Sequence, residues 1–408
     1  MPAFATGLRG RLGEIGRQGV SAQWAASLVC ALVSMALSVV LARLMTPSAF
    51  GGYAFYLGVG ASLGIILDGG FRTLLLRERA APTPGLGLNG PALAGAMLGH
   101  LLLAAPLLAV AALAWAGDWA APATALCFAV ITLTLWYSAW LKGAGELRRE
   151  AAWQVRCRLL SAATIMTGLW WFGPTATVVL LGWALGLLLA GWLTWPGQRP
   201  RLRWPRAPLY RAALGFAGID LATLIYHRVD IVLLYTLNHD PAEAGRYAAA
   251  YRLYDGVMLL SAPLALLVFR RMRQPGSGRS LELAAMGLAM AAGIVLALLG
   301  NGFGTFVAAG LFGADFAQAD LVGWLFGALI AALPNAVLTY WAIAHHQERF
   351  YALAAGLAAL FNLAANTWLI PRHGALGAAW STLGTESLLF ALLLGRWGMA
   401  HSHTPRAR

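Results

Sequence analysis

A chain of 408 residues is long enough for about two or three soluble domains, but its composition excludes them. Apolar residues make up 60% of the sequence and charged residues only 11%, whereas roughly 25% of a typical soluble domain is charged. The mean hydropathy is +0.68 and the formal net charge is +13. We infer a protein whose solvent is the lipid bilayer, and we exclude a disordered tail protein, a secreted disulfide scaffold and almost every soluble enzyme.

The cysteines give no sign of a disulfide framework or a metal site. The chain has 3 of them, Cys30, Cys127 and Cys157, far apart in the sequence, and the first two fall in apolar stretches. None has a neighbour at metal-ligand spacing. We therefore expect no bound metal and no cofactor.

Apolar stretches recur along the whole chain at the length of about 20 residues that a helix needs to cross a bilayer. We predict an all-α integral membrane protein with about 12 spans. The spans are expected at residues 20–42, 51–75, 90–116, 121–141, 159–173, 175–195, 212–236, 247–269, 281–299, 321–343, 350–370 and 376–395. The fifth span is short, and Phe172-Gly173-Pro174 leaves a tight turn before the sixth. Residues 302–313 are too short to cross, so we expect them to lie along an interface.

The arginines predict the orientation. If the N-terminus is cytoplasmic, most of them fall on the cytoplasmic side, and the outer loops hold only Arg43, Arg246 and Arg372. This bias is what the positive-inside rule produces. The first span follows basic residues as a signal peptide would, but it is too long for a cleaved one, so we expect it to be retained. We predict a multi-pass protein with both termini cytoplasmic, and the basic charge requires no nucleic acid partner.

A short repeat divides the chain into two halves. Pro47-x-x-x-Gly51-x-Tyr53-Ala54 recurs as Pro241-x-x-x-Gly245-x-Tyr247-Ala248. An even number of predicted spans separates the copies, so the halves have the same orientation, as in the parallel repeats of many transporters. We predict two pseudo-symmetric six-helix lobes, residues 1–195 and 212–408, joined by an Arg-rich cytoplasmic linker at 196–211.

Four stretches resemble the polysaccharide-exporter branch of the multidrug/oligosaccharidyl-lipid/polysaccharide flippase superfamily, the Wzx-type O-antigen flippases. The first is Leu41 to Tyr53, with Asp68-Gly69-Gly70 and Arg77-Glu78 after it. The others are Arg228-Val229-Asp230 with Gly245-Arg246-Tyr247 and Tyr251-Arg252-Leu253; Leu311-Phe312-Gly313; and Asn362, Asn366, Leu369-Ile370-Pro371, Gly374, Gly377-Ala378-Ala379 and Thr385-Glu386.

The resemblance implies a transporter and not an enzyme. Members of this family flip undecaprenyl-pyrophosphate-linked oligosaccharides across the bacterial inner membrane for O-antigen, lipopolysaccharide or exopolysaccharide synthesis. The implied partners are this lipid-linked substrate, the bilayer, H⁺ or Na⁺ as a coupling ion, and polysaccharide polymerase machinery. Members often carry more helices than this chain, which retains the spans of the common two-lobe core.

Charged residues inside the spans are the candidate site residues, because each costs on the order of 3 kcal/mol at the bilayer centre. They are Asp68, Asp220, Arg228, Asp230, Arg252, Asp255 and Glu386. Arg228 and Asp230 are expected at about the same membrane depth as Arg252 and Asp255 on the adjacent helix. Two explanations fit these charges. They form structural salt bridges, or Arg228 or Arg252 binds the anionic head while a carboxylate titrates. Asp220, His227 and Asp230 share one helical face as candidate proton or ion carriers.

Two further features bear on the substrate. Tyr247 and Tyr251 lie one turn apart and are placed to stack on sugar rings, although an interfacial aromatic belt explains Tyr247 equally well. Carboxylates outnumber arginines within the spans, which does not match a cationic cavity for pyrophosphate. Either several carboxylates are protonated, or the phosphate binds at the cytoplasmic mouth, near Arg72, Arg77 and Arg79.

Other functions remain open at this stage. A drug or cation exporter of the same superfamily suits an acidic interior. A glycan polymerase or ligase needs a large outer loop, and the longest here, near residues 300–320, is short and partly apolar. The sequence has no nucleotide-binding fingerprint, which argues against direct use of ATP.

Overall fold

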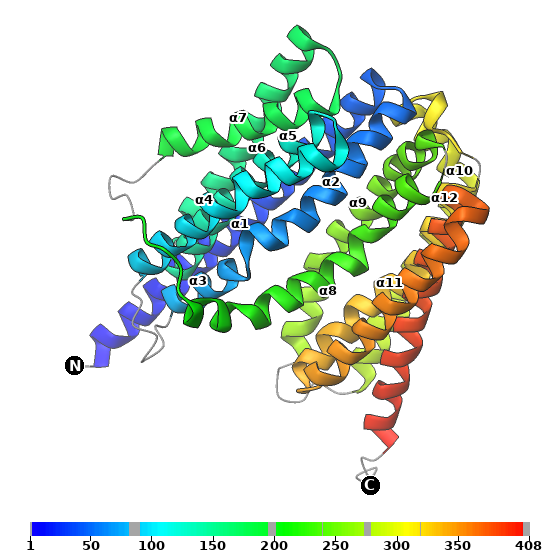
Figure 1. Ribbon diagram of the computed structural model, residues 1–408. Coiled ribbons are helices and arrows are strands. Elements are labelled where there is room, and N and C mark those ends of the chain that lie inside the picture. Colours follow the sequence, from blue (N-terminus) through cyan, green and yellow to red (C-terminus); the bar gives the residue numbers. More distant parts are fainter. Residues whose placement is uncertain are drawn as a thin grey trace. The chain divides into compact units, whose positions relative to one another are not determined.

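The structure is a computed structural model that describes residues 2–80, 90–194, 201–238, 240–272, 279–318 and 320–402. It does not describe the side chains of residues 2–18, 20, 219, 222, 223, 225–228, 260, 262–267, 269 and 270. The described chain is all-α (Figure 1). Its helices are α1 (Pro2–Leu44), α2 (Pro47–Asp68), α3 (Phe71–Ala80), α4 (Gly90–Ala116), α5 (Ala120–Gly143), α6 (Leu147–Phe172), α7 (Ala176–Thr194), α8 (Ala207–Leu237), α9 (Pro241–Met272), α10 (Arg279–Phe312), α11 (Leu321–Ala344) and α12 (Glu348–Ser402), with a 3-10 turn at Ala314–Phe316.

This architecture confirms the predicted fold class. Of the described helices, 8 are long and apolar enough to cross a membrane by length and composition. The helices α6, α8 and α9 carry more charged residues. The predicted tight turn between the fifth and sixth spans is present, because Gly173 adopts φ 81° between α6 and α7. The helix α6 is also longer than predicted and begins at Leu147.

The predicted single span at 51–75 is broken in the structure. The helix α2 ends at Asp68, and α3 begins at Phe71 after Gly69 and Gly70, whose φ values are 58° and 76°. A Cβ atom on Gly70 would lie 2.7 Å from the backbone nitrogen of Ala217, so this glycine also lets α8 approach closely. Apolar periodicity continues through the break and therefore did not reveal it.

The predicted interfacial segment at 302–313 is not a separate element, because residues 302–312 continue α10. Glycines on α10 face α11. A Cβ on Gly300 would lie 2.6 Å from Cβ of Phe326, and one on Gly304 would lie 2.7 Å from Cβ of Val322. Close helix packing thus carries α10 to Phe312. In contrast, α12 is interrupted at Gly374 (φ 54°, ψ −132°), which divides it where two spans were predicted.

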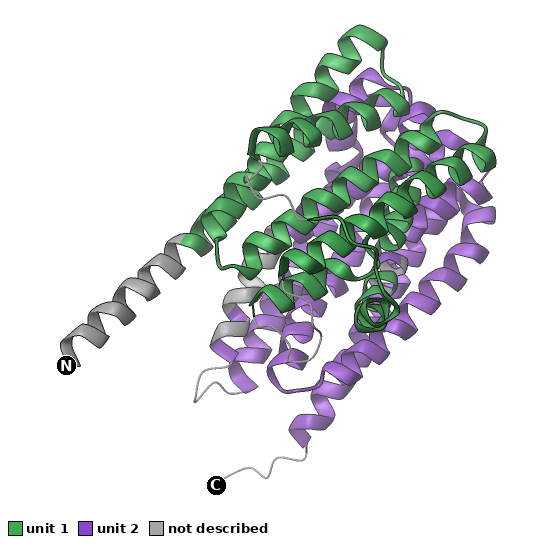
Figure 2. Ribbon diagram, turned by 60° about the vertical axis from the view of Figure 1, so that its left-hand side comes forward, with its two compact units in different colours: residues 1–38, 56–221 green, residues 39–55, 222–408 purple. Residues whose placement is uncertain are grey.

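The chain forms two compact units, coloured separately in Figure 2. Unit 1 comprises Met1–Ser38 and Tyr56–Leu221, and unit 2 comprises Val39–Phe55 and Ala222–Arg408. In unit 1, α5 packs against α3, α4, α6 and α7. In unit 2, the largely buried helix α11 packs against α9, α10 and α12. Both copies of the sequence repeat mark helix starts, because α2 begins at Pro47 and α9 at Pro241.

Candidate functional site

A buried carboxylate, Asp230 on α8, lies at the centre of a polar cluster inside unit 2. Its side chain is 4% exposed. The hydroxyl of Tyr247 on α9 donates to Asp230 Oδ2 at 3.0 Å, and the amide of Asn366 on α12 donates to Oδ1 at 2.7 Å. The hydroxyl of Thr382 lies 3.3 Å from Oδ2. Three helices therefore converge on one carboxylate, and these described partners are all neutral.

The cluster continues away from Asp230 along α12. The amide of Asn366 also donates to Asn362 Oδ1 at 3.0 Å, and the amide of Asn362 donates to Thr385 Oγ1 at 3.2 Å. These side chains are all buried. An apolar membrane helix that folds back on itself at Gly374 thus turns amides and hydroxyls inward, where they satisfy one another.

Glu386 is a second buried carboxylate, one turn beyond Thr382. Asn335, which follows Pro334 in α11, donates from Nδ2 to Glu386 Oε2 at 2.9 Å. The hydroxyl of Tyr254 lies 3.3 Å from Glu386 Oε1. Tyr247, Tyr251 and Tyr254 form a row of ring contacts on α9, with centroids 5.6 Å and 5.2 Å apart. A row of tyrosines therefore connects the surroundings of Asp230 with those of Glu386.

This arrangement suits a proton or a small hard cation. The oxygens of carboxylate, amide and hydroxyl groups are the ligands that such cations prefer. Among the described side chains, Asn366 Oδ1 and Asn335 Oδ1 are buried acceptors that lack a hydrogen-bond partner. An unpaired buried acceptor costs about 1–3 kcal/mol, and a bound cation or proton would offset that cost.

In unit 1 the structure brings together three predicted site residues, Arg72, Asp68 and Asp220. The guanidinium of Arg72 on α3 lies 3.3 Å from Asp220 Oδ1 on α8. The backbone nitrogen of Arg72 donates to Asp68 Oδ1 at 3.2 Å, and Trp136 Nε1 donates to the same oxygen at 2.6 Å. Asp68 thus caps α3 and fixes the start of the helix that carries Arg72. The Arg72 side chain remains 41% exposed.

Glu150 is a buried carboxylate of unit 1 that the sequence did not single out. It is 0% exposed. Lys142 Nζ lies 3.2 Å from its Oε1, and Gln23 donates to Oε2 at 2.8 Å. Ser138 and Gln154 also donate to it. These contacts join α1, α5 and α6, as expected of a carboxylate that stabilises helix packing.

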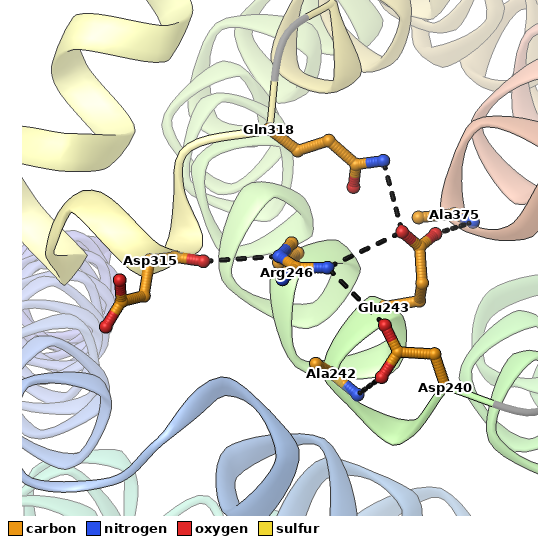
Figure 3. Close-up of polar contacts among 7 residues, drawn as sticks. All are labelled: Asp240, Ala242, Glu243, Arg246, Asp315, Gln318 and Ala375. Carbon is orange, nitrogen blue, oxygen red and sulfur yellow. Dashed lines mark hydrogen bonds and ion pairs between the residues drawn. The ribbon is translucent and has the colours of Figure 1, made fainter.

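The predicted outer arginines are engaged in polar contacts within unit 2. Arg246 lies 3.7 Å from Asp240, 3.6 Å from Glu243 and 3.2 Å from the carbonyl oxygen of Asp315 (Figure 3). Glu243 in turn accepts from the backbone nitrogen of Ala375 at 2.7 Å, just after the break in α12. Two further arginines bind backbone carbonyls, Arg43 that of Leu311 at 2.8 Å and Arg372 that of Trp368 at 2.6 Å.

For the other predicted site residues, the structure gives the helix but describes fewer side-chain contacts. Arg252 and Asp255 are half-buried on α9. The side chains of Arg228 and His227 lie outside the described residues. Whether Arg228 forms a structural salt bridge or binds the anionic head therefore stays open. Asp220 belongs to unit 1 and Asp230 to unit 2, and the expected common role of Asp220, His227 and Asp230 on one helical face stays a prediction.

Sequence reasoning missed Thr382 beside Asp230, and Asn335 and Tyr254 beside Glu386. It named Asn362 and Asn366 only as residues that carry the family resemblance. A signal for their role in a polar cluster was present, because these two amides lie one helical turn apart within an apolar span. Apart from His227, Tyr247 and Tyr251, the candidate site residues were selected by their charge. Polar side chains at i, i+4 in a membrane helix are informative for the same energetic reason.

Comparison with known proteins identifies the family. Residues 17–269 match the family model described as polysaccharide biosynthesis protein. The chain belongs to this family. Its family and fold are those of multi-pass membrane transporters and flippases of the multidrug/oligosaccharidyl-lipid/polysaccharide superfamily, which confirms the family resemblance seen in the sequence. No curated protein matches the sequence with significance.

Solved structures share the fold over nearly the whole chain. The lipid II flippase MurJ in an inward closed conformation aligns with a TM-score of 0.73 at 12% identity, covering 92% of this chain and 87% of that one. An inward-facing multidrug resistance transporter of the MATE family aligns with a TM-score of 0.68 at 12% identity, covering 94% and 99%. At these identities the likeness establishes the fold alone.

Proposed function

We propose that this protein flips undecaprenyl-pyrophosphate-linked oligosaccharide units from the cytoplasmic to the periplasmic leaflet of the bacterial inner membrane. The product would serve O-antigen, lipopolysaccharide or exopolysaccharide synthesis. Two lobes, residues 1–195 and 212–408, would expose the substrate alternately to each side. The observation that carries the proposal is the match of residues 17–269 to the polysaccharide biosynthesis family.

Coupling to H⁺ or Na⁺ would supply the driving force. The support comes from Asp230, a buried carboxylate whose described partners are neutral donors. An ionised carboxylate in such a place is stabilised when a cation joins it, and a cation that binds and leaves on opposite sides of the membrane can drive transport. Glu386, Asp255, Asp68, Asp220 and His227 are the further proposed ion-coupling residues.

The anionic head of the substrate needs cationic partners. We assign this role to Arg72, Arg228 and Arg252, and sugar stacking to Tyr251. Arg72 is the best supported of the arginines, because its side chain is anchored at Asp220 yet 41% exposed. A guanidinium can exchange one carboxylate oxygen for a phosphate oxygen without leaving its position. Within the predicted spans, carboxylates outnumber arginines. The pairing of Arg72 with Asp220 gives one of these carboxylates a cationic partner.

The test of the cargo is a deletion strain. Without the protein, lipid-linked oligosaccharide should accumulate on the inner leaflet and a surface polysaccharide should be lost, while sensitivity to cationic dyes stays unchanged. Dye sensitivity with normal polysaccharide would instead assign the protein to drug or cation export. The excess of carboxylates within the predicted spans left this alternative open.

A further inference from the structure

The segment that joins α7 to α8 is docked on α4. Within residues 201–206, which have no helical structure, the backbone nitrogen of Arg203 donates to the carbonyl oxygen of Gly95 at 3.1 Å. A Cβ atom on Gly95 would lie 3.2 Å from the carbonyl carbon of Arg201 and would overlap its oxygen. A Cβ on Gly99 would do the same to Arg203, with 3.1 Å to the carbonyl carbon. Two glycines one turn apart therefore form the flat strip of α4 on which the segment lies.

Several side chains of this segment remain exposed although its backbone lies on α4. Leu202 is 51% exposed and Trp204 is 62% exposed. Arg201, Arg203, Arg206 and Arg211 are exposed beside them. Leu209 is buried against α4 with Leu93 and Met97, which fixes the start of α8 as well. The backbone is thus held in place, while exposed arginines alternate along the segment with exposed large apolar side chains.

The arginines of this surface are not neutralised by any carboxylate that the structure describes. The sequence has no acidic residue between Glu150 and Asp220, and the Asp220 carboxylate is engaged by Arg72. None of the four arginines has an ion pair to a residue that the structure describes. Tryptophan beside arginine at the predicted cytoplasmic face matches the boundary of an anionic leaflet, where indole rings sit at headgroup level and each basic residue adds attraction.

We propose that residues 201–211, held on α4 by Gly95 and Gly99, form a binding surface for anionic phospholipid headgroups, with Leu202 and Trp204 reaching into the headgroup–acyl boundary. The occupant is a membrane lipid and not the transported substrate, because the alternating apolar side chains need an acyl region beside the phosphate. The site lies wholly within unit 1, so it requires no contribution from the other unit.

The test uses the full chain in nanodiscs, with a bimane label on Leu202→Cys and the native cysteines replaced by alanine. Two preparations of phosphatidylcholine nanodiscs are compared. One contains a small amount of phosphatidylglycerol that carries a nitroxide near the headgroup, and the other contains the same amount of phosphatidylcholine with the same nitroxide. The labelled phosphatidylglycerol should quench the bimane several-fold more. Replacing Arg201, Arg203 and Arg206 by glutamine should remove most of this several-fold preference and bring the quenching by the two lipids to nearly equal values, because each basic residue adds attraction to an anionic headgroup. The control triple Arg271→Gln, Arg279→Gln, Arg349→Gln removes the same charge from unit 2 and should leave the preference intact.

A second pair of variants tests the docking. Gly95→Ala with Gly99→Ala should lower the preferential quenching because the segment is displaced, whereas Gly191→Ala, where nothing lies within 4 Å, should not. Equal quenching by the two lipids in the parent protein would overturn the proposal, as would an equal effect of the control triple. Loss of the preference on adding soluble pyrophosphate at constant ionic strength would assign the surface to a free phosphate ligand instead of a lipid.

Discussion

Gly51 and Gly245, the matching glycines of the two repeat copies, each lie against the helix start of the other copy. A Cβ on Gly51 would lie 2.8 Å from the backbone nitrogen of Gly245 and would overlap the carbonyl oxygen of Pro241. A Cβ on Gly245 would lie 2.7 Å from the carbonyl carbon of Pro47. The repeat thus encodes a reciprocal backbone contact between α2 and α9, inside unit 2.

This contact predicts opposite effects for neighbouring glycines. Gly51→Ala and Gly245→Ala should each destabilise the protein by about 1–3 kcal/mol, because the backbone they meet cannot yield as a side chain does. Gly52→Ala is the control, since its Cβ would lie 3.6 Å from Tyr235 Oη and alanine favours the helix. The midpoint of thermal unfolding in detergent would be measured for the two variants and for the control. Equal midpoints for Gly51→Ala and Gly52→Ala would contradict the close contact.

Asp230 should separate ion coupling from folding. Asp230→Asn keeps a polar side chain among Tyr247, Asn366 and Thr382, so the protein should fold but lose ion-dependent export. Asp230→Leu removes the acceptor and leaves three buried groups short of a partner, which should cost about 1–3 kcal/mol for each. Expression, unfolding midpoint and polysaccharide export would be measured together. Ion-dependent export by a well-folded Asp230→Asn protein would rule out Asp230 as the coupling residue.

Arg72 should matter more for transport than for stability. Its ion pair with Asp220 is partly exposed, with side chains 41% and 27% accessible, so breaking it should cost no more than about 1 kcal/mol. Arg72→Gln should therefore fold normally and fail in export, and Arg72→Lys should keep partial activity because it retains the charge without the bidentate geometry. Arg149→Gln, which breaks the exposed pair with Glu146, is the matched control. Normal export by Arg72→Gln would remove Arg72 from the substrate site.

Glu150 should behave in the opposite way. Glu150→Gln replaces a fully buried acceptor of several donors by a group that accepts at one oxygen only, and it leaves Lys142 without its partner. A loss of about 3 kcal/mol or more is expected. Glu146→Gln removes a partly exposed carboxylate nearby and should change stability by less than about 1 kcal/mol. A stable, fully active Glu150→Gln protein would show that the buried network is not needed for folding.

The predicted orientation is tested by reporter fusions. Fusions near residues 80, 150, 204 and 275 should be cytoplasmic, and one in the turn near residue 240 should be periplasmic, because the arginines gather on one side of the predicted spans. Alkaline phosphatase is active only in the periplasm and is the reporter for both sets. Phosphatase activity from a fusion within 196–211 would overturn the map.

The sequence by itself determined the fold class and most helix positions. Each apolar stretch of about 20 residues has one stable solution in a bilayer, a helix whose backbone groups bond internally, so α4, α5, α7 and α11 follow from composition alone. It also located the break at Gly374 as a gap between two spans, and it singled out Asp230 and Glu386 because a buried charge is costly wherever it lies.

Only the tertiary structure decided which groups meet. The backbone of α8 meets Gly70 at the break between α2 and α3, and α10 packs against α11 at Gly300 and Gly304. Asn335 and Thr382 join the carboxylate clusters through contacts between residues far apart in the sequence, such as Asn335 and Glu386, which lie 51 positions apart. A helix face is periodic and local, but the partner of that face is chosen by packing between helices, which no single segment encodes.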